Sequence, residues 1–500
     1  MFDFTNTHKA VIAHKEILCD NLTPLALLGA LDAKVLLESA YNETGKDRYS
    51  IMIVCEAFSV YKENGEHTLV CQNEKIPLKE IFSAYKPTQE SNEARSDLTS
   101  QGFLESLALV RTLAPNPNGI LPDNLPLPLG GAGYIGYEFF AEIEEVHFAK
   151  PPLYDAPECG FMFGRDFLIF DHLFDRLHIV SVGYAHEKTL INPTQRIEKI
   201  INSLHNLPQA PLESPYLNEE YVIENATSQS EYESMVRQIQ EGIYAGDLLQ
   251  CVISQYINIR SSFPPLEAYR RLRHLNPSPY MFYYRFENFT ILGASPEIMI
   301  RLKSTQDKCF FTIRPIAGTR PRGESVAQDL EFEKELLNDE KENSEHLMLL
   351  DLARNDAGKV SVGGGVKVNA RNLIERYSHV MHIVSEVQGE LDRERFFKRD
   401  ALKAAFPAGT LSGAPKIEAI KTIESLESHS RGIYGGAIGY FTYDEDMDFA
   451  IAIRTAVYQN GVYYVRSGAG IVQDSIPSNE YKETQNKARS ILNTLIPTKD

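Results

Sequence analysis

Two pairs of glutamates form the clearest chemical pattern in this sequence. Glu342 and Glu345 make one pair, and Glu480 and Glu483 make the other. Residues three apart on a helix lie on the same face, so each pair would present two carboxylates to one side. Four carboxylates that converge without cationic partners repel one another, and a divalent cation would relieve that repulsion. Because the ligands would be oxygens only, the pattern favours Mg²⁺ over Zn²⁺. If only the spacing is considered, two solvent-exposed helix faces are the more favoured interpretation. The motifs around each pair favour the metal site instead.

The elements expected around these pairs are strands and separate helices. Apolar residues recur at helical spacing from Tyr232 to Ile243 and stop at Gly246, and a strand follows at 249–259. Further helices are predicted at about 264–275, 328–353, 396–404, 415–427 and 479–496. Further strands are predicted at 280–287, 289–301, 309–316, 434–443, 449–458 and 462–466. This mixture favours an α+β fold over a series of strand–helix–strand units.

The first half of the chain is richer in predicted strands. Alternating runs at 49–61 and 167–182 predict antiparallel strands. Polar or Pro-rich stretches predict loops at 86–101, 114–128 and 207–229, and the last is the best boundary. We therefore expect an N-terminal domain at 1–210 and a second domain at 228–496.

Composition excludes several classes of function. The chain has 500 residues, 43% of them hydrophobic, and no apolar run of about 18 residues that could span a membrane. Its N-terminus does not resemble a secretory signal, and six scattered cysteines are typical of reduced thiols in a cytoplasmic protein. The net charge of −18 argues against nucleic acid or an anionic membrane as a partner. An anionic substrate would need local Arg, Lys, backbone N–H groups or a metal.

The second half contains a series of dense motifs. They are GDLLQ at 246–250, NPSPYM at 276–281, GASPE at 293–297, RPIAGTR at 314–320, DEKENSEHLMLLDLARND at 339–356, RYSHVMH at 376–382, FPAGTLSGAP at 406–415, RTA at 454–456 and SGAGIVQDSIPSNEYKE at 467–483. Together and in this order they resemble the chorismate-utilising enzymes, strongly over about 228–495 and more weakly before that. The resemblance implies a four-layer α/β/β/α sandwich, in which two curved antiparallel sheets pack face to face with helices outside. It also implies an active site in the second domain.

The resemblance assigns roles to the four glutamates. Glu345 and Glu483 look like direct Mg²⁺ ligands, while Glu342 and Glu480 would hold metal-bound water or adjust the charge. Mg²⁺ typically keeps several waters and takes one or two protein carboxylates plus an anionic substrate group. Which glutamate of each pair touches the ion stays open.

A second set of residues would bind the anionic substrate, because chorismate carries two carboxylates. Backbone N–H groups of Gly468-Ala469-Gly470 can face an anion, since glycine tolerates positive φ and close approach. Arg454 can hold a carboxylate through two hydrogen bonds. Tyr434 and the pair Gly318-Thr319 match further substrate contacts in the family. The alternatives are a hairpin turn for the glycine run and a surface ion pair for Arg454.

The proton-transfer residues are also implied by the resemblance. Glu297 matches the general acid that protonates the departing C4 hydroxyl, a role that needs a carboxyl with a raised pKa. His382 matches a histidine that acts in the later loss of pyruvate, although a packed core residue is the alternative. Thr410 would contact the substrate or brace its loop.

Two positions discriminate among the members of the family. Isochorismate-forming relatives carry a Lys base at the position of Gln250, and aminodeoxychorismate-forming relatives commonly carry a Lys at the position of Ala317. Both departures favour direct attack of ammonia at C2 and loss of pyruvate, which gives anthranilate. The nearest alternative is component I of aminodeoxychorismate synthase. A catalytically idle tryptophan-binding sensor is the alternative from another class.

The N-terminal half is expected to hold a regulatory site. Leu36-Leu37-Glu38-Ser39 resembles the segment that binds tryptophan as a feedback inhibitor, with Pro279, Tyr280 and Met281 as the facing wall. An aromatic and a polarisable Met suit an indole ring, and Ser39 suits the amino-acid head. No Gly-x-Cys-x-Gly nucleophile turn occurs. Ammonia from glutamine would therefore need a separate amidotransferase subunit, component II, in a heterotetramer.

Overall fold

The structure, a computed structural model, describes nearly all of the chain. The described residues are 2–3, 8–41, 45–46, 48–72, 74–84, 102–207, 221–305, 307–377 and 380–495. The loop predicted at 86–101 lies outside them, as does most of the loop predicted at 207–229. The end of the latter is not a loop, since 221–226 form a strand.

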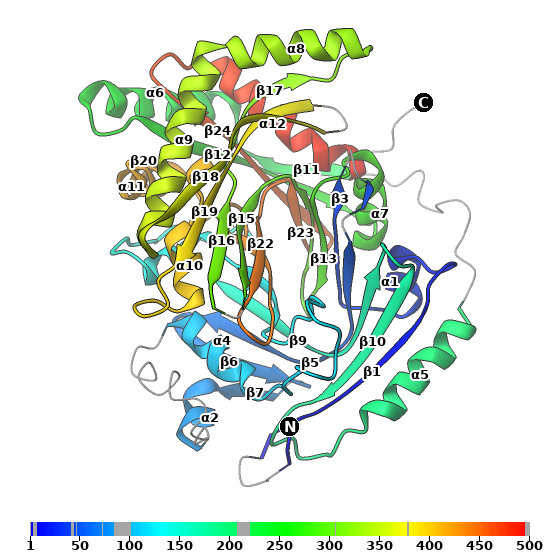
Figure 1. The fold of residues 1–500 in the computed structure, drawn as a ribbon. Helices are drawn as coiled ribbons and strands as arrows, with labels where there is room; N and C mark the ends of the chain where they lie inside the picture. The colour runs from blue at the N-terminus through cyan, green and yellow to red at the C-terminus, as the bar shows by residue number, and fades with distance from the viewer. Residues whose placement is uncertain are drawn as a thin grey trace.

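Two curved antiparallel sheets form the centre of the molecule (Figure 1). From edge to edge, the first sheet contains β1 (Val11–Leu18), β10 (Arg176–Gly183), β9 (Cys159–Asp171), β5 (Tyr49–Glu63), β2 (Val35–Glu38), β13 (Tyr280–Arg285), β14 (Thr290–Ser295), β23 (Thr455–Gln459), β24 (Val462–Ile471) and β12 (Gln250–Ser261). The far edge of β12 pairs with β11 (Tyr221–Ala226) and β20 (Gly413–Ala414).

The second sheet shares two strands with the first. It contains β7 (Glu74–Pro77), β6 (Glu66–Cys71), β5, β9, β8 (Ala132–Ile135), β21 (Ala437–Phe441), β22 (Met447–Ile451), β15 (Ile298–Ser304), β16 (Cys309–Ile313) and β19 (Val380–Leu391). β17 (Ile316–Pro321) follows β16 in the chain and pairs with the same edge of β19. β18 (Ser361–Arg376) pairs with the other edge of β19. The strands β5 and β9, of 15 and 13 residues, are long enough to join both sheets. A separate ribbon pairs β3 (Ala40–Tyr41) with β4 (Gly45–Lys46).

Alternation along the strands separates two cores. On β13 and β2, Phe282, Tyr284 and Val35 enter the core between the sheets, whereas Met281 and Leu36 face the helices outside. Successive side chains of a strand point to opposite faces, so each strand of the first sheet feeds both cores.

Helices cover the outer faces of the sheets, which gives the four layers visible from left to right in Figure 1. Those against the first sheet are α1 (Pro24–Ala30), α5 (Pro193–His205), α7 (Pro265–Leu275) and α12 (Pro477–Leu495). Those beside the second are α4 (Phe103–Arg111), α8 (Val326–Asn338), α9 (Glu340–Gly358) and α10 (Lys398–Ala405), with α2 (Leu78–Ala84) against β6. α6 (Gln229–Ala245) and α11 (Lys416–Leu426) pack on β12 and β24. The predicted α+β sandwich is confirmed.

Several predicted elements are divided in the structure. The helix predicted at 328–353 is two helices, because Asp339 caps the second by accepting the N–H of Glu342 at 3.1 Å. The strands predicted at 289–301 and 449–458 each divide into two, with Glu297 and Arg454 in the breaks. The run at 167–182 is a hairpin of β9 and β10, and β24 extends to Ile471 rather than 466. Strands β17 to β19 were not predicted.

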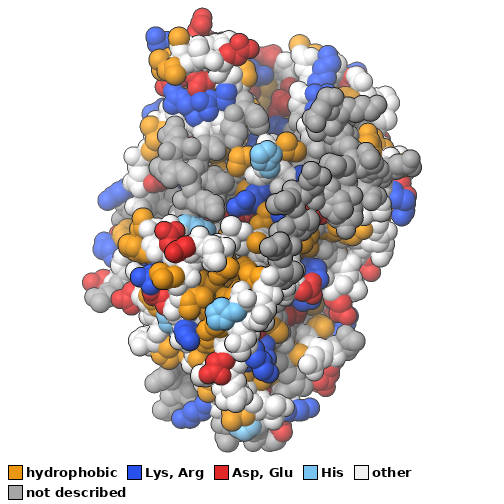
Figure 2. All heavy atoms as spheres, turned by 90° about the vertical axis from the view of Figure 1, so that its right-hand side faces the viewer, with side chains coloured by type: hydrophobic (Ala, Val, Ile, Leu, Met, Phe, Trp, Pro, Cys, Tyr) orange, Lys and Arg blue, Asp and Glu red, His pale blue; other side chains and the backbone are white. Residues whose placement is uncertain are grey.

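The two halves of the chain share both sheets. β2 pairs with β13 in the first sheet, and β8 pairs with β21 in the second. The functional division into 1–210 and 228–496 stays a prediction. In the described part of the chain, no helix is long and apolar enough to cross a membrane. On the face shown in Figure 2, acidic side chains are interspersed with basic and apolar ones.

Candidate active site

Glu297 lies in the break between β14 and β15, where Pro296 interrupts strand pairing. Its side chain is buried, with the residue only 6% exposed, and its Oε1 accepts a hydrogen bond from Thr410 Oγ1 at 2.8 Å. Burial raises the pKa of Glu297 to about 7, although Thr410, Lys487 and Arg454 oppose the rise. A carboxyl of this kind can be protonated near neutral pH and act as a general acid. Thr410 therefore braces Glu297.

Arg454 places a positive charge near Glu297, without an ion-pair partner among the described residues. It occupies the break between β22 and β23 with a positive φ of 48°, a conformation that few non-glycine residues adopt. Burial lowers the pKa of Arg454, while the charges of Tyr377 and Glu297 raise it. Its guanidinium group has no hydrogen bond or ion pair with another described residue, so the alternative of a surface ion pair is not formed among these residues. A partly buried guanidinium without a counterion among the described residues suits an anionic ligand.

His382 is held in one tautomer on β19. Its Nδ1 lies 2.8 Å from the carbonyl oxygen of Gly318, which can only accept, so Nδ1 carries the proton. Nδ1 is also 3.1 Å from Thr319 Oγ1. Burial and then the charge of Arg454 lower the pKa of His382 to about 4. The imidazole is therefore neutral at pH 7, with Nε2 as its available acceptor.

Gly318 and Thr319 lie at a bulge in β17, where the register with β19 shifts. Gly318 has a φ of 65°, and a Cβ there would lie 3.2 Å from Glu342 Oε2. Only glycine combines this conformation with so close an approach. The bulge thus lies between His382 and the first pair of glutamates.

The glycine run forms a strand rather than the turn considered from sequence. Gly468, Ala469 and Gly470 pair with β12, and neither glycine has a positive φ. Close approach explains them instead: a Cβ at Gly468 would lie 2.9 Å from Tyr434 Oη, and one at Gly470 would lie 2.6 Å from Gln250 Nε2. The side chain of Ala469 packs in the core of α6 and α11, so only its backbone could contact a substrate.

Gln250 and Tyr434 complete this wall of the site. The Oε1 atom of Gln250 is buried and has no hydrogen-bond partner. Burial raises the pKa of Tyr434 to about 12, so its hydroxyl stays protonated. An unpaired buried acceptor is costly, which points to a donor supplied by a ligand.

The two glutamate pairs come from different helices, α9 and α12, and their charges interact. Burial raises the pKa of Glu345 to about 7, and Glu342, Glu483 and Glu480 add to the rise. Burial also raises the pKa of Glu342 and of Glu480. The four carboxylates are therefore close enough for their charges to interact, whereas the spacing alone had favoured two solvent-exposed helix faces.

The expectation that they lack cationic partners was wrong. Arg320 Nη1 lies 3.3 Å from Glu342 Oε1, Lys341 Nζ lies 3.8 Å from Glu345 Oε1, and Lys487 Nζ lies 2.8 Å from Glu483 Oε1. Within the described residues, no three carboxylate, imidazole or thiol groups are arranged as ligands of one metal ion. The donor set still fits Mg²⁺, because it is oxygen-only and the partner cations leave the pKa of Glu345 raised.

Lys487 is a site residue that sequence reasoning missed. Besides Glu483, its Nζ contacts the carbonyl oxygen of Gly468 at 3.1 Å, and its charge lowers the pKa of both Glu297 and His382. The available signal was its position four residues after Glu483 on a predicted helix, where the two side chains meet.

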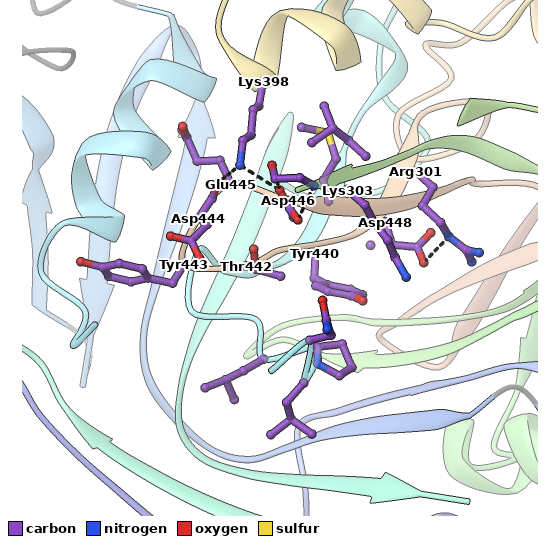
Figure 3. A pocket seen from close by; sticks show the side chains of 18 of the residues that line it. Arg301, Lys303, Lys398, Tyr440, Thr442, Tyr443, Asp444, Glu445, Asp446 and Asp448 are labelled. Carbon is purple, nitrogen blue, oxygen red and sulfur yellow. Dashed lines mark hydrogen bonds and ion pairs between the residues drawn. The ribbon is translucent and has the colours of Figure 1, made fainter. Parts of the chain in front are cut away.

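The residues predicted to bind tryptophan line a separate cavity of about 1340 Å³. Ser39 follows β2, and Met281 pairs with Glu38 across β2 and β13, so segments from both halves of the chain meet here. Figure 3 shows Tyr440, Asp448 and Arg301 on the wall of this cavity. The hydroxyl of Tyr280 donates to Asp448 Oδ1 at 2.8 Å. Pro279 also lines the cavity.

Comparison with known proteins gives a consistent result. The sequence matches the family model of chorismate binding enzymes over residues 65–493. Anthranilate synthase component 1 of Spirochaeta aurantia is 37% identical, over 95% of this chain and 94% of its own, and that of Neisseria meningitidis serogroup B is 40% identical, over 96% and 93%.

Two solved structures have similar folds. Anthranilate synthase component I from Streptococcus pneumoniae TIGR4 has a TM-score of 0.72 and 32% identity, covering 95% of this chain and 98% of its own. The menaquinone-specific isochorismate synthase from Escherichia coli has a TM-score of 0.68, covering 98% and 96%, but only 16% identity, which shows the fold alone.

Proposed function

This chain belongs to the chorismate-binding enzymes, and we propose that within the family it is the large subunit of an anthranilate synthase, a lyase that converts chorismate and ammonia into anthranilate and pyruvate. The observation that carries the proposal is the convergence of Glu297, His382 and Arg454 beside four glutamates. This arrangement offers an acid, a base and a cation to a dianionic ring.

Substrate binding is assigned to the cations and backbone groups that surround Glu297 and His382. Arg454 would bind one carboxylate of chorismate, and Lys487 would help, while Tyr434 and the backbone at Gly468 and Gly470 line the other side. Mg²⁺, held by Glu345 and Glu483 with Glu342 and Glu480 beside them, would supply positive charge that attracts a substrate carboxylate. The local cations overcome the repulsion expected from a net charge of −18.

The reaction then proceeds in two steps. Ammonia adds at C2 and its nitrogen releases one proton to solvent, while the C4 hydroxyl takes the proton of Glu297 and leaves as water. The C2 hydrogen next leaves as a proton and the C3–O bond breaks, so that the ring becomes aromatic and enolpyruvate departs, which takes up a proton on carbon to become pyruvate. Neutral His382 offers Nε2 as the acceptor for the C2 proton. Gln250 cannot remove a proton from water, and its Oε1 suits an N–H donor such as ammonia.

Product analysis tests the proposal. The protein is incubated with chorismate, Mg²⁺ and ammonium, and the aminobenzoate is separated and identified by mass and fluorescence. We expect the ortho isomer, anthranilate, since Ala317 offers no amine to form the para isomer. The para isomer would identify an aminodeoxychorismate synthase, and no turnover would favour a sensor.

The pH dependence should report on Glu297. A general acid must be protonated, so kcat/KM for chorismate should fall about tenfold per unit as pH rises above about 7, the pKa of Glu297. Because the hydrogen bond from Thr410 lowers this pKa, Thr410→Val should move the fall to higher pH. Rates are measured at a constant concentration of free ammonia. A rate that is flat from about pH 6 to about pH 9 would contradict the assignment.

We also propose that tryptophan inhibits the enzyme from the cavity of Ser39, Pro279, Tyr280 and Met281. Its volume, about 1340 Å³, exceeds the roughly 300–1,000 Å³ typical of small-molecule sites. The inhibitor would contact both halves of the chain, so binding could alter how β2 and β13 meet.

Ser39→Phe should raise the tryptophan concentration needed for half-inhibition about tenfold or more, by filling the space for the amino-acid head. The uninhibited rate should not change. Inhibition curves measure the effect. Asn118→Phe, at another part of the cavity wall, is the control. Equal inhibition of the Ser39→Phe variant and the unmodified protein would show that tryptophan does not bind at Ser39.

Partners and location follow from the family. Glutamine-dependent activity is assigned to a separate amidotransferase subunit, component II, that delivers ammonia to Gln250, in a heterotetramer. The cytoplasm is the proposed compartment, where the six free thiols would stay reduced.

A further inference from the structure

Arg431 has no role in the assignments above, yet its guanidinium group is among the most completely satisfied in the protein. The side chain is 2% exposed. Nη1 donates to the carbonyl oxygen of Leu411 at 2.6 Å, and Nη2 donates to that of Val252 at 2.7 Å. Nε and Nη2 also donate to the carboxylate of Glu427, the latter at 2.6 Å. One planar group thus joins three separate segments of the chain.

Each of these segments carries a residue of the proposed active site. Leu411 follows Thr410, which holds the carboxylate of Glu297. Val252 lies two residues beyond Gln250 on β12. Arg431 itself begins the turn that ends at Tyr434, whose N–H bonds back to the carbonyl oxygen of Arg431 at 3.2 Å. The guanidinium carbon lies 4.6 Å from the centre of the Tyr137 ring and 5.7 Å from that of Tyr434.

The carboxylate of Glu427 at this junction pairs with two arginines. Glu427 Oε2 accepts from Arg466 Nη1 at 2.8 Å, and its Oε1 accepts from both the backbone N–H and the hydroxyl of Ser254 at 2.8 Å. Burial alone would raise the pKa of Glu427, but Arg431 and Arg466 lower it. The pair therefore stays ionised and does not compete for substrate carboxylates as Arg454 does.

The N-terminal half takes part as well. Glu138, in the short 3₁₀ helix η2 (Tyr137–Glu142), accepts the N–H of Arg431 at 2.7 Å and that of Gly432 at 3.1 Å. These bonds fix the start of the turn that leads to Tyr434.

We propose that Arg431 is a positioning residue for the reaction proposed above, which sets the relative places of Thr410, Gln250 and Tyr434 without touching the substrate. The role requires donors that diverge in one plane toward Leu411, Val252 and Glu427. A lysine ammonium is a compact group on a flexible stem and cannot reproduce that geometry. If the ion pair of Arg431 and Glu427 were only structural, replacing Arg431 would change stability but not the kinetic constants of the folded enzyme.

The test compares Arg431→Lys with Arg165→Lys. Arg165 is a matched control: it is buried, pairs with Glu187, donates to the carbonyl oxygen of Val182 at 3.1 Å and lies over the ring of Tyr184. Its contacts are on β10 and in the segment that follows it, at the other edge of the first sheet. Both variants should lose thermal stability.

When rates are expressed per folded molecule, only Arg431→Lys should lose catalytic activity. We expect its kcat to fall about a hundredfold and its affinity for chorismate, measured by calorimetry, about tenfold, while Arg165→Lys stays within about twofold in both. The fall in kcat/KM with pH should also move upward, since a displaced Thr410 no longer lowers the pKa of Glu297. Equal kinetic constants in the two folded variants would overturn the proposal.

A milder variant keeps the test decisive if Arg431→Lys does not fold. Glu138→Gln keeps one acceptor but replaces the other with an amide that cannot accept, so the turn should loosen and the KM for chorismate should rise about tenfold. An unchanged KM in this variant would overturn the inference. Turnover by the unmodified protein tests the proposed function. The kcat and KM of each variant relative to the unmodified protein test the role of Arg431.

Discussion

Replacing Glu297 with Gln is expected to lower kcat about a thousandfold, within the range that general acids contribute. The amide has nearly the same shape and can still accept from Thr410, but it carries no proton to give to the C4 hydroxyl. Steady-state formation of anthranilate, followed by fluorescence, measures the effect. The affinity for chorismate should change little, because Arg454 and Lys487 bind it.

Glu56→Gln provides the matched control for this experiment. Glu56 is also a largely buried carboxyl with a raised pKa, and it also accepts a hydroxyl hydrogen bond, from Ser59 at 2.6 Å. It lies on β5, outside the proposed site. A Glu297→Gln enzyme as active as Glu56→Gln would show that another group protonates the leaving oxygen.

Replacing Glu345 with Gln is expected to remove Mg²⁺-dependent turnover, with a loss of about a hundredfold or more. Burial raises the pKa of Glu345 to about 7, and the charges of Glu342, Glu483 and Glu480 add to the rise. A neutral amide there would weaken cation binding while relieving repulsion, so the melting temperature should stay equal or rise. Calorimetric titration with Mg²⁺ measures binding independently of turnover.

Glu340→Gln on the same helix is the control, since Glu340 is exposed in the first turn of α9. It should keep both the Mg²⁺ affinity and the rate. If Glu345→Gln binds Mg²⁺ and turns over as Glu340→Gln does, the metal site lies elsewhere.

Sequence patterns predicted the regular parts of the fold well and its interruptions poorly. α6 ends at Gly246, which takes a positive φ of 88° as its position suggested. The breaks at Glu297, Asp339 and Arg454 were missed, because each lies in an otherwise continuous apolar or helical pattern. The cap at Asp339 is local, whereas the conformation at Glu297 also depends on a contact with a distant segment, the hydrogen bond from Thr410. Local periodicity contains no information about such contacts.

The candidate site shows the same limit. Spacing placed the four glutamates on two helix faces, and the resemblance named the residues around them. The i,i+4 spacing of Lys341 with Glu345 and of Lys487 with Glu483 could have predicted those two ion pairs. Neither spacing nor resemblance could place Arg320 beside Glu342, since Arg320 lies on β17 and Glu342 on α9. The alternative of a hairpin turn for the glycine run was wrong, because a glycine needed for close approach in a strand looks, in sequence, like one needed for a turn.

The strands that serve both sheets limit how this protein could have evolved or be rearranged. Since β5 and β9 are hydrogen-bonded into each layer, and β2 and β8 close the gaps beside them, neither half could be inherited or exchanged as a self-sufficient module. If the chain were cut near residue 210, the C-terminal fragment would expose unpaired strand edges at β13 and β21. Such edges are prone to aggregation. The architecture itself therefore keeps the proposed regulatory cavity and the proposed active site in one polypeptide.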